Sequence, residues 1–173
     1  AEFAASESLA CEAPLTVDFE NLSNDGLFGV DSMNFEWIIG PSLINGHYVF
    51  DTVSITNLSQ TFTEPDIYPV SLTAIDLYNC ELHYLDTIVI GDVDAYFEID
   101  TVLDCDPQTV SFTNLSSVFD TTGHFEIVEY HWTFGDTSLC PDHFGPDPPP
   151  CVFETGTYTF SLTVTDNFGC LSL

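Results

Sequence analysis

The residues of this chain that are best suited to chemistry are its cysteines and its carboxylates. It has 28 acidic residues, five histidines and no lysine or arginine. Cysteines form disulfide bonds or bind zinc, and in an acidic chain of exported character we expect disulfides. A zinc site needs four clustered ligands, and Cys140, His143 and Cys151 come closest without a fourth. The residues expected in disulfide bonds are Cys11, Cys80, Cys105, Cys140, Cys151 and Cys170.

The carboxylates have no permanent cation within the chain to pair with. Such a surface repels nucleic acid and anionic membranes. Two interpretations remain open: a solvated, self-repelling surface, or one that binds divalent cations. The candidate calcium ligands are Asp92 and Asp94, which alternate along the short segment 91–94 and can point to one side, although a solvated hinge would have the same sequence. Asp142 and Asp147 are a second, weaker candidate pair.

Two sequence patterns predict glycosylation. Asn21, Asn57 and Asn114 fit the Asn-x-Ser acceptor, but Asn21 and Asn114 favour backbone turns instead. The second pattern is Asp, then Ser or Thr, then an apolar residue or Thr. It is similar to the O-glycan acceptor of exported Bacteroidetes-type proteins. The acceptors that it predicts are Ser32, Thr52, Thr87, Thr101 and Thr121.

The sequence gives little support for a catalytic site. His131 and Asp136 share one short segment, but they are neighbours along a strand and no nucleophile is identifiable beside them. The other histidines lack the spacing of metal ligands, and acidic pairs occur throughout so acidic a chain. We therefore expect that the protein is not an enzyme.

One strand motif occurs twice and organises the chain. In the segment 156–170, apolar residues alternate with Thr and Ser, the period of a strand with one buried face. The segment 67–80 repeats this pattern. The residues Tyr68, Leu72, Asp76 and Cys80 fall on Tyr158, Leu162, Asp166 and Cys170. The sequence therefore predicts one module written twice.

The remaining strands also occur as pairs. The predicted pairs are 1–6 with 95–97, 11–23 with 105–116, and 35–40 with 130–136. The first copy adds a strand candidate at 47–56 and a closing strand after Cys80, for which the second copy has no counterpart. The second copy instead has a proline-dense segment, 140–151, which must be an exposed loop. We place the domains at 1–91 and 92–173.

The repeat selects one set of cysteine pairs. Cys11 and Cys80 occupy the same positions in the first copy as Cys105 and Cys170 do in the second. Each pair is expected to tie the start of its module to the turn after its penultimate strand. The two remaining cysteines, Cys140 and Cys151, would close the proline loop.

The second copy resembles a polycystic kidney disease (PKD) module over nearly all of residues 92–173. The matching motifs are Tyr-His-Trp-Thr-Phe-Gly-Asp at 130–136 and Gly-Thr-Tyr-Thr-Phe-Ser-Leu-Thr-Val-Thr-Asp at 156–166. The resemblance implies two tandem immunoglobulin-like β-sandwiches of about seven strands each. It also implies that Trp37 and Trp132 fill the cores, and that Tyr68 and Tyr158 close a sheet corner through their hydroxyls.

PKD modules act as spacers and interaction modules in cell-surface and secreted proteins, and versions with a cysteine at each end look like those of Bacteroidetes-type surface adhesins. We therefore expect an extracellular, non-catalytic structural or adhesive repeat from a longer protein or filament. Its partners would be neighbouring modules or subunits, and surface glycans or proteins, without direct membrane insertion. An open edge in the second copy would accept a strand from a neighbour.

The alternative is a carbohydrate-binding accessory region of a secreted hydrolase. It needs coplanar aromatic rings exposed on one face. The candidate rings are Tyr48, Phe50, Phe144 and Phe153.

Overall fold

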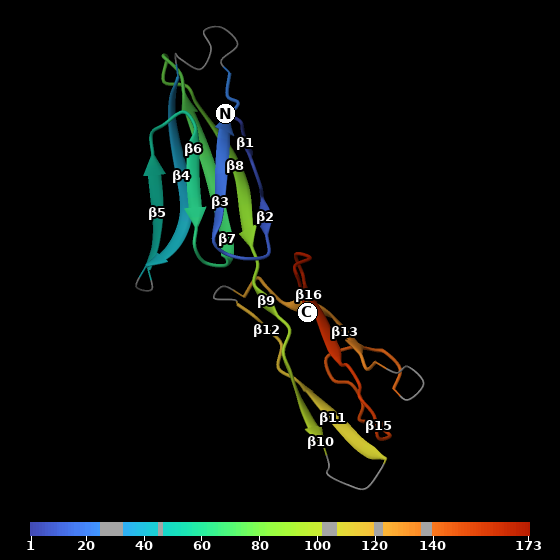
Figure 1. The fold of residues 1–173 in the computed structure, drawn as a ribbon. Helices are drawn as coiled ribbons and strands as arrows, with labels where there is room; N and C mark the ends of the chain where they lie inside the picture. Colours follow the sequence, from blue (N-terminus) through green and yellow to red (C-terminus); the bar gives the residue numbers. More distant parts are fainter. Residues whose placement is uncertain (25–32, 45–46, 102–106, 120–122, 136–139) are drawn as a thin grey trace. The chain divides into compact units, whose positions relative to one another are not determined.

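The computed structural model describes residues 1–24, 33–44, 47–101, 107–119, 123–135 and 140–173, without the side chains of residues 41–52 and 101. All regular structure in this part of the chain is β-strand, and it contains no helix (Figure 1). The predicted all-β class is therefore confirmed. The chain divides into two compact units, Ala1–Ile90 and Gly91–Leu173, so the division falls at the first residue of the predicted linker.

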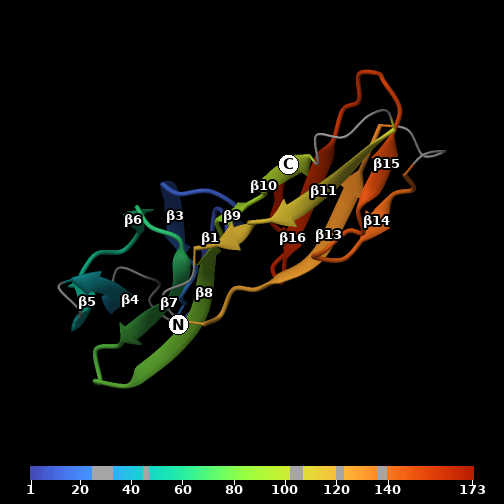
Figure 2. The same cartoon turned by 90° about the horizontal axis from the view of Figure 1, so that it is seen from below.

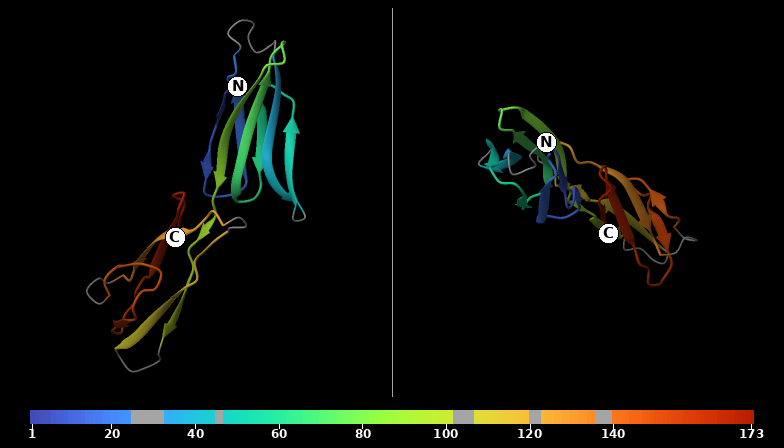
Figure 3. Two further views of the ribbon diagram at one scale, coloured as in Figure 1. Left: turned by 180° about the vertical axis from the view of Figure 1, so that it is seen from behind. Right: turned by 90° about the horizontal axis from the view of Figure 1, so that it is seen from above.

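Unit 1 consists of two sheets, and its strands can be followed in Figures 1 and 3. The first sheet has the order β1-β3-β6 and is antiparallel. The second has the order β2-β8-β7-β4-β5 and is antiparallel except that β2 runs parallel to β8. The strands are β1 (Phe3–Ala5), β2 (Leu9–Ala10), β3 (Leu15–Asn21), β4 (Asn34–Ile44), β5 (His47–Val53), β6 (Leu58–Phe62), β7 (Asp66–Ile75) and β8 (Glu81–Ile90).

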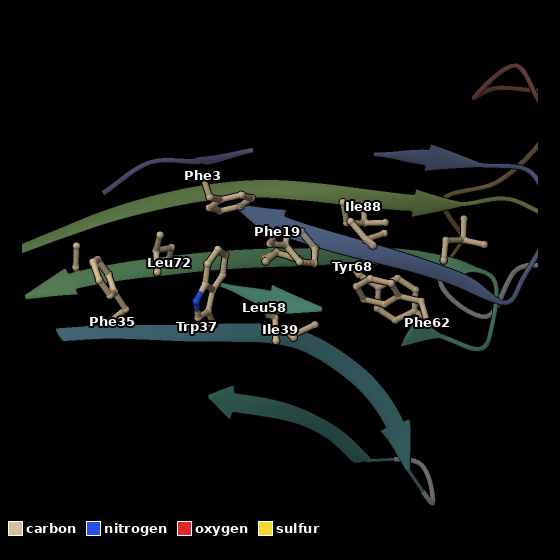
Figure 4. Packing of buried hydrophobic residues seen from close by; sticks show 14 residues of the cluster. Phe3, Phe19, Phe35, Trp37, Ile39, Leu58, Phe62, Tyr68, Leu72 and Ile88 are labelled. Atoms are coloured by element: carbon tan, nitrogen blue, oxygen red, sulfur yellow. The ribbon is translucent and has the colours of Figure 1, made fainter. Parts of the chain in front are cut away.

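The core of unit 1 follows from alternation along these strands. In β3, Val17 and Phe19 are buried, whereas Asp18 and Glu20 between and beyond them are exposed. Because successive side chains of a strand point to opposite faces, one face of β3 is apolar and the other is polar and charged. Figure 4 shows Trp37 among side chains contributed by strands of both sheets. This arrangement is consistent with a β-sandwich.

Unit 2 has the same kind of layering with shorter strands (Figure 2). One sheet has the order β10-β11-β15 and another the order β14-β13-β16-β17, while β9 and β12 form a separate pair. The strands are β9 (Val93–Asp94), β10 (Phe97–Thr101), β11 (Gln108–Asn114), β12 (Ser117–Val118), β13 (Ile127–Thr133), β14 (His143–Phe144), β15 (Cys151–Phe153), β16 (Ser161–Asp166) and β17 (Leu171–Ser172).

The strand registers of the two units agree residue for residue at repeat positions. Trp37 lies opposite Leu72 in the β4–β7 pair, and Trp132 lies opposite Leu162 in the β13–β16 pair. Phe3 lies opposite Asn21, and Phe97 lies opposite Asn114. The sequence repeat is therefore a repeat of strand pairing and not only of composition.

Two details differ from the sequence-based expectations. The second copy does have a strand after its last turn, because β17 pairs with β16 at Val164–Ser172 and Thr165–Leu171. The prediction that it lacks one is wrong, although β17 has two residues where β8 has ten. In addition, the expected linker contains a strand: Val93 and Asp94 pair with Val118 and Ser117.

Candidate functional site

The four aromatic residues predicted as architectural are held by matching hydrogen bonds in the two units. Trp37 and Trp132 are both fully buried at 0% exposure. Each donates its indole N–H to a backbone carbonyl at 3.0 Å, that of Ile55 in unit 1 and that of Gly145 in unit 2. A buried indole needs such an acceptor, because an unpaired donor in the core is costly.

The two tyrosines close equivalent loops. The Tyr68 hydroxyl donates to the Glu64 carbonyl at 2.8 Å, and the Tyr158 hydroxyl donates to the Glu154 carbonyl at 3.2 Å. Burial raises the pKa of Tyr68 to about 12, and the negative charges of Asp66 and Glu64 act in the same direction. Tyr68 is thus held as a neutral hydrogen-bond donor well above neutral pH.

The cysteine pairing predicted for the first module is wrong. Cys80 is a free, exposed thiol, whereas Cys11 is disulfide-bonded. The reason is the parallel β2–β8 pair, in which Ala10 lies opposite Ile90, so that Cys11 is near the end of β8 while Cys80 precedes its start. The ten residues of β8 span about 30 Å, and a disulfide requires Cα atoms within about 7 Å.

The predicted pairs of the second module have different outcomes. Cys170 is disulfide-bonded, but Cys105, its predicted partner, lies outside the described residues. Cys140 and Cys151 form a disulfide bond with a Cα–Cα distance of 5.7 Å, so the proline loop is closed as predicted.

The closed proline loop is fixed at both ends to different sheets. On one side, β14 pairs with β13, and the Gly145 N–H also donates to the Tyr130 carbonyl at 3.3 Å. On the other side, β15 pairs with β11, with Cys151 opposite Val110. The loop is thus a short, covalently closed segment held by strand pairs at both ends.

This loop presents an aromatic and acidic cluster on the surface, composed of Phe144, His131 and Asp142. Phe144 is 67% exposed and stacks on His131 with ring centroids 4.5 Å apart and planes 7° apart. An Asp142 carboxylate oxygen lies 3.5 Å from His131 Nε2. The cluster places an exposed ring face beside a carboxylate. The sequence singled out Phe144 as a candidate ring and Asp142 as a weaker calcium candidate and weighed His131 only beside Asp136, because their proximity depends on the β13–β14 pairing.

Not all four aromatic rings that were predicted to bind carbohydrate are exposed. Phe153 is 3% exposed, because β15 alternates and its first and third residues, Cys151 and Phe153, point into the core. Its assignment as an exposed ring is therefore wrong. Tyr48 and Phe50 lie in β5, but their side chains are outside the described part of the structure. Of the four predicted rings, Phe144 is the one seen on the surface.

The candidate calcium ligands Asp92 and Asp94 lie at the start of unit 2. Asp92 and Asp94 are exposed on either side of buried Val93, as alternation along β9 requires. Among the residues that the structure describes, no group of three or more acidic, His or Cys side chains could hold a metal ion. Calcium binding at this pair stays a prediction.

The glycosylation candidates fall into three groups. Thr87 is half-buried in β8, and its backbone N–H donates a hydrogen bond to the Asp86 carboxylate at 2.8 Å. Thr52 and Thr101 lie in β5 and β10, but their side chains are not described, and Ser32 and Thr121 lie outside the described residues altogether.

The Asn-x-Ser sites at repeat positions form turns, as predicted. The Asn21 side-chain carbonyl accepts from the Ser23 N–H at 2.9 Å, and that of Asn114 accepts from the Ser116 N–H at 3.0 Å. Asn57, the third acceptor candidate, accepts from the Asn21 N–H at 3.0 Å.

Comparisons with known proteins do not place the chain. No protein-family model matches it, and no curated protein matches it at a significant level. In the described part of the chain there is no helix of the length and apolarity that a membrane crossing requires.

Proposed function

We propose that the chain is a pair of non-catalytic structural or adhesive modules from an extracellular or cell-surface protein or filament. Each module is an immunoglobulin-like sandwich of the PKD type. The modules act as spacers that hold shape and as contact units for neighbouring modules or subunits, and Ca²⁺ at Asp92 and Asp94 is their candidate cofactor.

The immunoglobulin-like assignment is supported by strand order. In unit 1, β1-β3-β6 and β8-β7-β4-β5 correspond to the A-B-E and G-F-C-C′ sheets of that fold, with β2 as the second half of a split first strand. In unit 2, β10-β11-β15 and β17-β16-β13-β14 give the same order. The buried tryptophan on the third main strand and the tyrosine hydroxyl bond at the corner accompany it in both units.

The observation that carries the proposal is the duplication of the architectural hydrogen bonds in the two units. The indole bonds, the tyrosine bonds and the Asn-Ser turns all recur in both units. The Phe144–His131–Asp142 cluster lies in unit 2, and the side chains of the corresponding segment of unit 1, residues 41–52, are outside the described part of the structure. Repetition of one scaffold is what an array of spacer modules requires.

Single-molecule force spectroscopy tests the mechanical role. The chain would be pulled from its two ends in the presence of a reductant, so that disulfide bonds do not restrict extension. We expect two separate unfolding events, one for each sandwich, because each unit has its own aromatic core. Smooth extension without force peaks would contradict a spacer that holds its shape under force.

The exposure of Phe144 favours a second candidate function, that of a carbohydrate-binding accessory region of a secreted hydrolase. Sugars stack on exposed rings, and Asp142 could accept hydrogen bonds from their hydroxyls. A glycan array probed with the chain and with Phe144→Ala tests it. The matched control is Phe119→Ala, since Phe119 is also an exposed ring of unit 2 at 44%. Specific binding that Phe144→Ala removes and Phe119→Ala retains would favour this candidate over the structural role.

A further inference from the structure

The outer face of the sheet β14-β13-β16-β17 carries the aromatic and acidic cluster of unit 2. Trp132 and Leu162, which lie opposite each other in β13 and β16, are both buried. Because side chains alternate along a strand, His131 and Glu129 in β13 point to the other, outer face. Phe144 lies opposite His131 in the β13–β14 pair and stacks on its ring, so it belongs to the same face.

The stack leaves one face of the Phe144 ring open to solvent. The imidazole of His131 covers the other face, since the two ring planes are 7° from parallel and their centroids are 4.5 Å apart. Phe144 is nevertheless 67% exposed. An open aromatic face attracts a cation, because the π-electrons of the ring give that face a negative potential.

Carboxylates lie on both sides of this ring along the direction of β13. Asp142 comes just before β14, which runs antiparallel to β13, and its carboxylate oxygen lies 3.5 Å from His131 Nε2. Glu129 comes two residues before His131, on the opposite side of the stack, and is exposed. Among the described residues His131 Nε2 has no hydrogen-bond partner, so its contact with Asp142 is not a hydrogen bond. The Asp142 carboxylate can therefore accept hydrogen bonds from a ligand.

The charge of this face is not balanced by Lys or Arg, because the chain has 28 acidic residues and none of either. A negative face with an aromatic ring between two carboxylates is complementary to a group that is both flat and cationic. The guanidinium of arginine meets both requirements. It stacks on aromatic rings, and its N–H groups pair with carboxylates in a fixed geometry.

We propose that this face docks an arginine side chain of a partner protein. The guanidinium stacks on the open face of Phe144 and donates hydrogen bonds to Asp142 or Glu129 beside it. A second copy of these 173 residues does not supply this group, because it contains no arginine. The inference rests on the proposed role of the modules as contact units, and it names the chemistry of the partner: a protein surface with an exposed arginine.

The test uses three blocked peptides, acetyl-Gly-Xaa-Gly-amide, with arginine, citrulline or lysine in the centre. Citrulline has nearly the shape of arginine without its charge. ¹H–¹⁵N NMR of the labelled full chain measures each dissociation constant at physiological salt, where screening limits the general attraction of cations to an acidic chain. We expect the arginine peptide to shift the amide signals of Asp142, Phe144 and His131 in a saturable way. The lysine peptide should bind about threefold more weakly, because it lacks the planar fork, and the citrulline peptide should not bind.

Variants of the cluster assign the binding to this face. Phe144→Ala should weaken binding of the arginine peptide about threefold or more, and Asp142→Asn about twofold or more. Two matched controls should leave the binding unchanged. Asp147→Asn removes the same charge from another exposed position of the same loop, and Phe119→Ala removes another exposed ring of unit 2.

Three results would overturn the proposal. Equal binding of the citrulline and arginine peptides would mean that the contact does not depend on charge. Equal binding of the lysine and arginine peptides would remove the guanidinium as the group that is recognised. An equal loss in Asp142→Asn and Asp147→Asn would mean a general attraction to the acidic surface. Force peaks and sugar binding are measured in separate experiments, so failure here is distinguishable from failure of the proposed function.

Discussion

At the scale of single residues, the architecture depends on a few side chains that bind the backbone. Tryptophan, tyrosine, asparagine and aspartate each supply the same bond in both units, as the indole and turn distances show. Gly135 is a further case, because its φ is +77° and an added Cβ would lie 2.8 Å from the Thr159 carbonyl oxygen. The Phe-Gly turn therefore requires glycine.

The Tyr68 hydroxyl gives a pH dependence at the residue scale. Its pKa is raised from 10.0 to about 12 in the folded protein, so folding disfavours the tyrosinate. The stabilisation is fully present below pH 10 and is lost as the pH rises through about 12. The loss is on the order of 2 kcal/mol.

Urea unfolding at pH 8 to 12, followed by the fluorescence of Trp37 in a Trp132→Phe background, measures this effect. A Cys80→Ser background avoids thiol exchange at high pH. Tyr68→Phe should be about 1 kcal/mol less stable at pH 8, because it lacks the bond to Glu64, and its stability should fall less steeply between pH 10 and 12. An identical alkaline slope in both proteins would remove Tyr68 as the cause.

At the scale of elements, the alternation of apolar and polar residues predicted where strands lie. It did not predict which strands pair with one another. The two-residue period located β3, β7 and β16, and the repeat aligned their registers. The Cys11–Cys80 pairing failed because nothing in the residue types indicates that β2 runs parallel to the end of β8. Phe153 was misplaced because proline density suggested a loop where β15 pairs with β11 and turns its ring inward.

The candidate contact cluster was only partly predictable for the same reason. Phe144 stands out in the sequence as an aromatic residue in a proline-dense loop. Its neighbours His131 and Asp142 join it through the β13–β14 pair, which has only two residue pairs and no alternating pattern of its own.

The proline loop yields a prediction at this scale. Replacing Cys140 and Cys151 together by Ser should destabilise unit 2 by about 3 kcal/mol, since the disulfide closes a short loop in the unfolded chain. Phe144 should also lose its fixed position on His131. Denaturant unfolding followed by Trp132 fluorescence measures the first effect. Cys80→Ser is the matched control and should leave this transition unchanged, because Cys80 is a free thiol. Equal stability of the double variant and the parent would show that the loop needs no covalent closure.

At the scale of the whole molecule, the chain combines a repeated scaffold with an acidic surface. Its 28 carboxylates and lack of Lys and Arg leave five histidines as the titratable cations of its side chains. Stability must therefore come from aromatic cores and hydrogen-bonded sheets rather than from ion-pair networks. Each unit has a core cluster of its own, centred on one tryptophan. Two cores of this kind predict that the two units unfold separately.

Unfolding of Trp132→Ala followed by the fluorescence of Trp37 tests this central claim most directly, because the chain contains only two tryptophans. Loss of a fully buried indole should destabilise unit 2 by about 3–5 kcal/mol. Far-UV circular dichroism should show this as an early transition, and the reciprocal Trp37→Ala variant should show the converse. If the account is right, the Trp37 midpoint in Trp132→Ala matches that of the parent chain. A Trp37 midpoint that falls together with the loss of unit 2 would mean that the two halves fold as one body rather than as two copies of one sandwich.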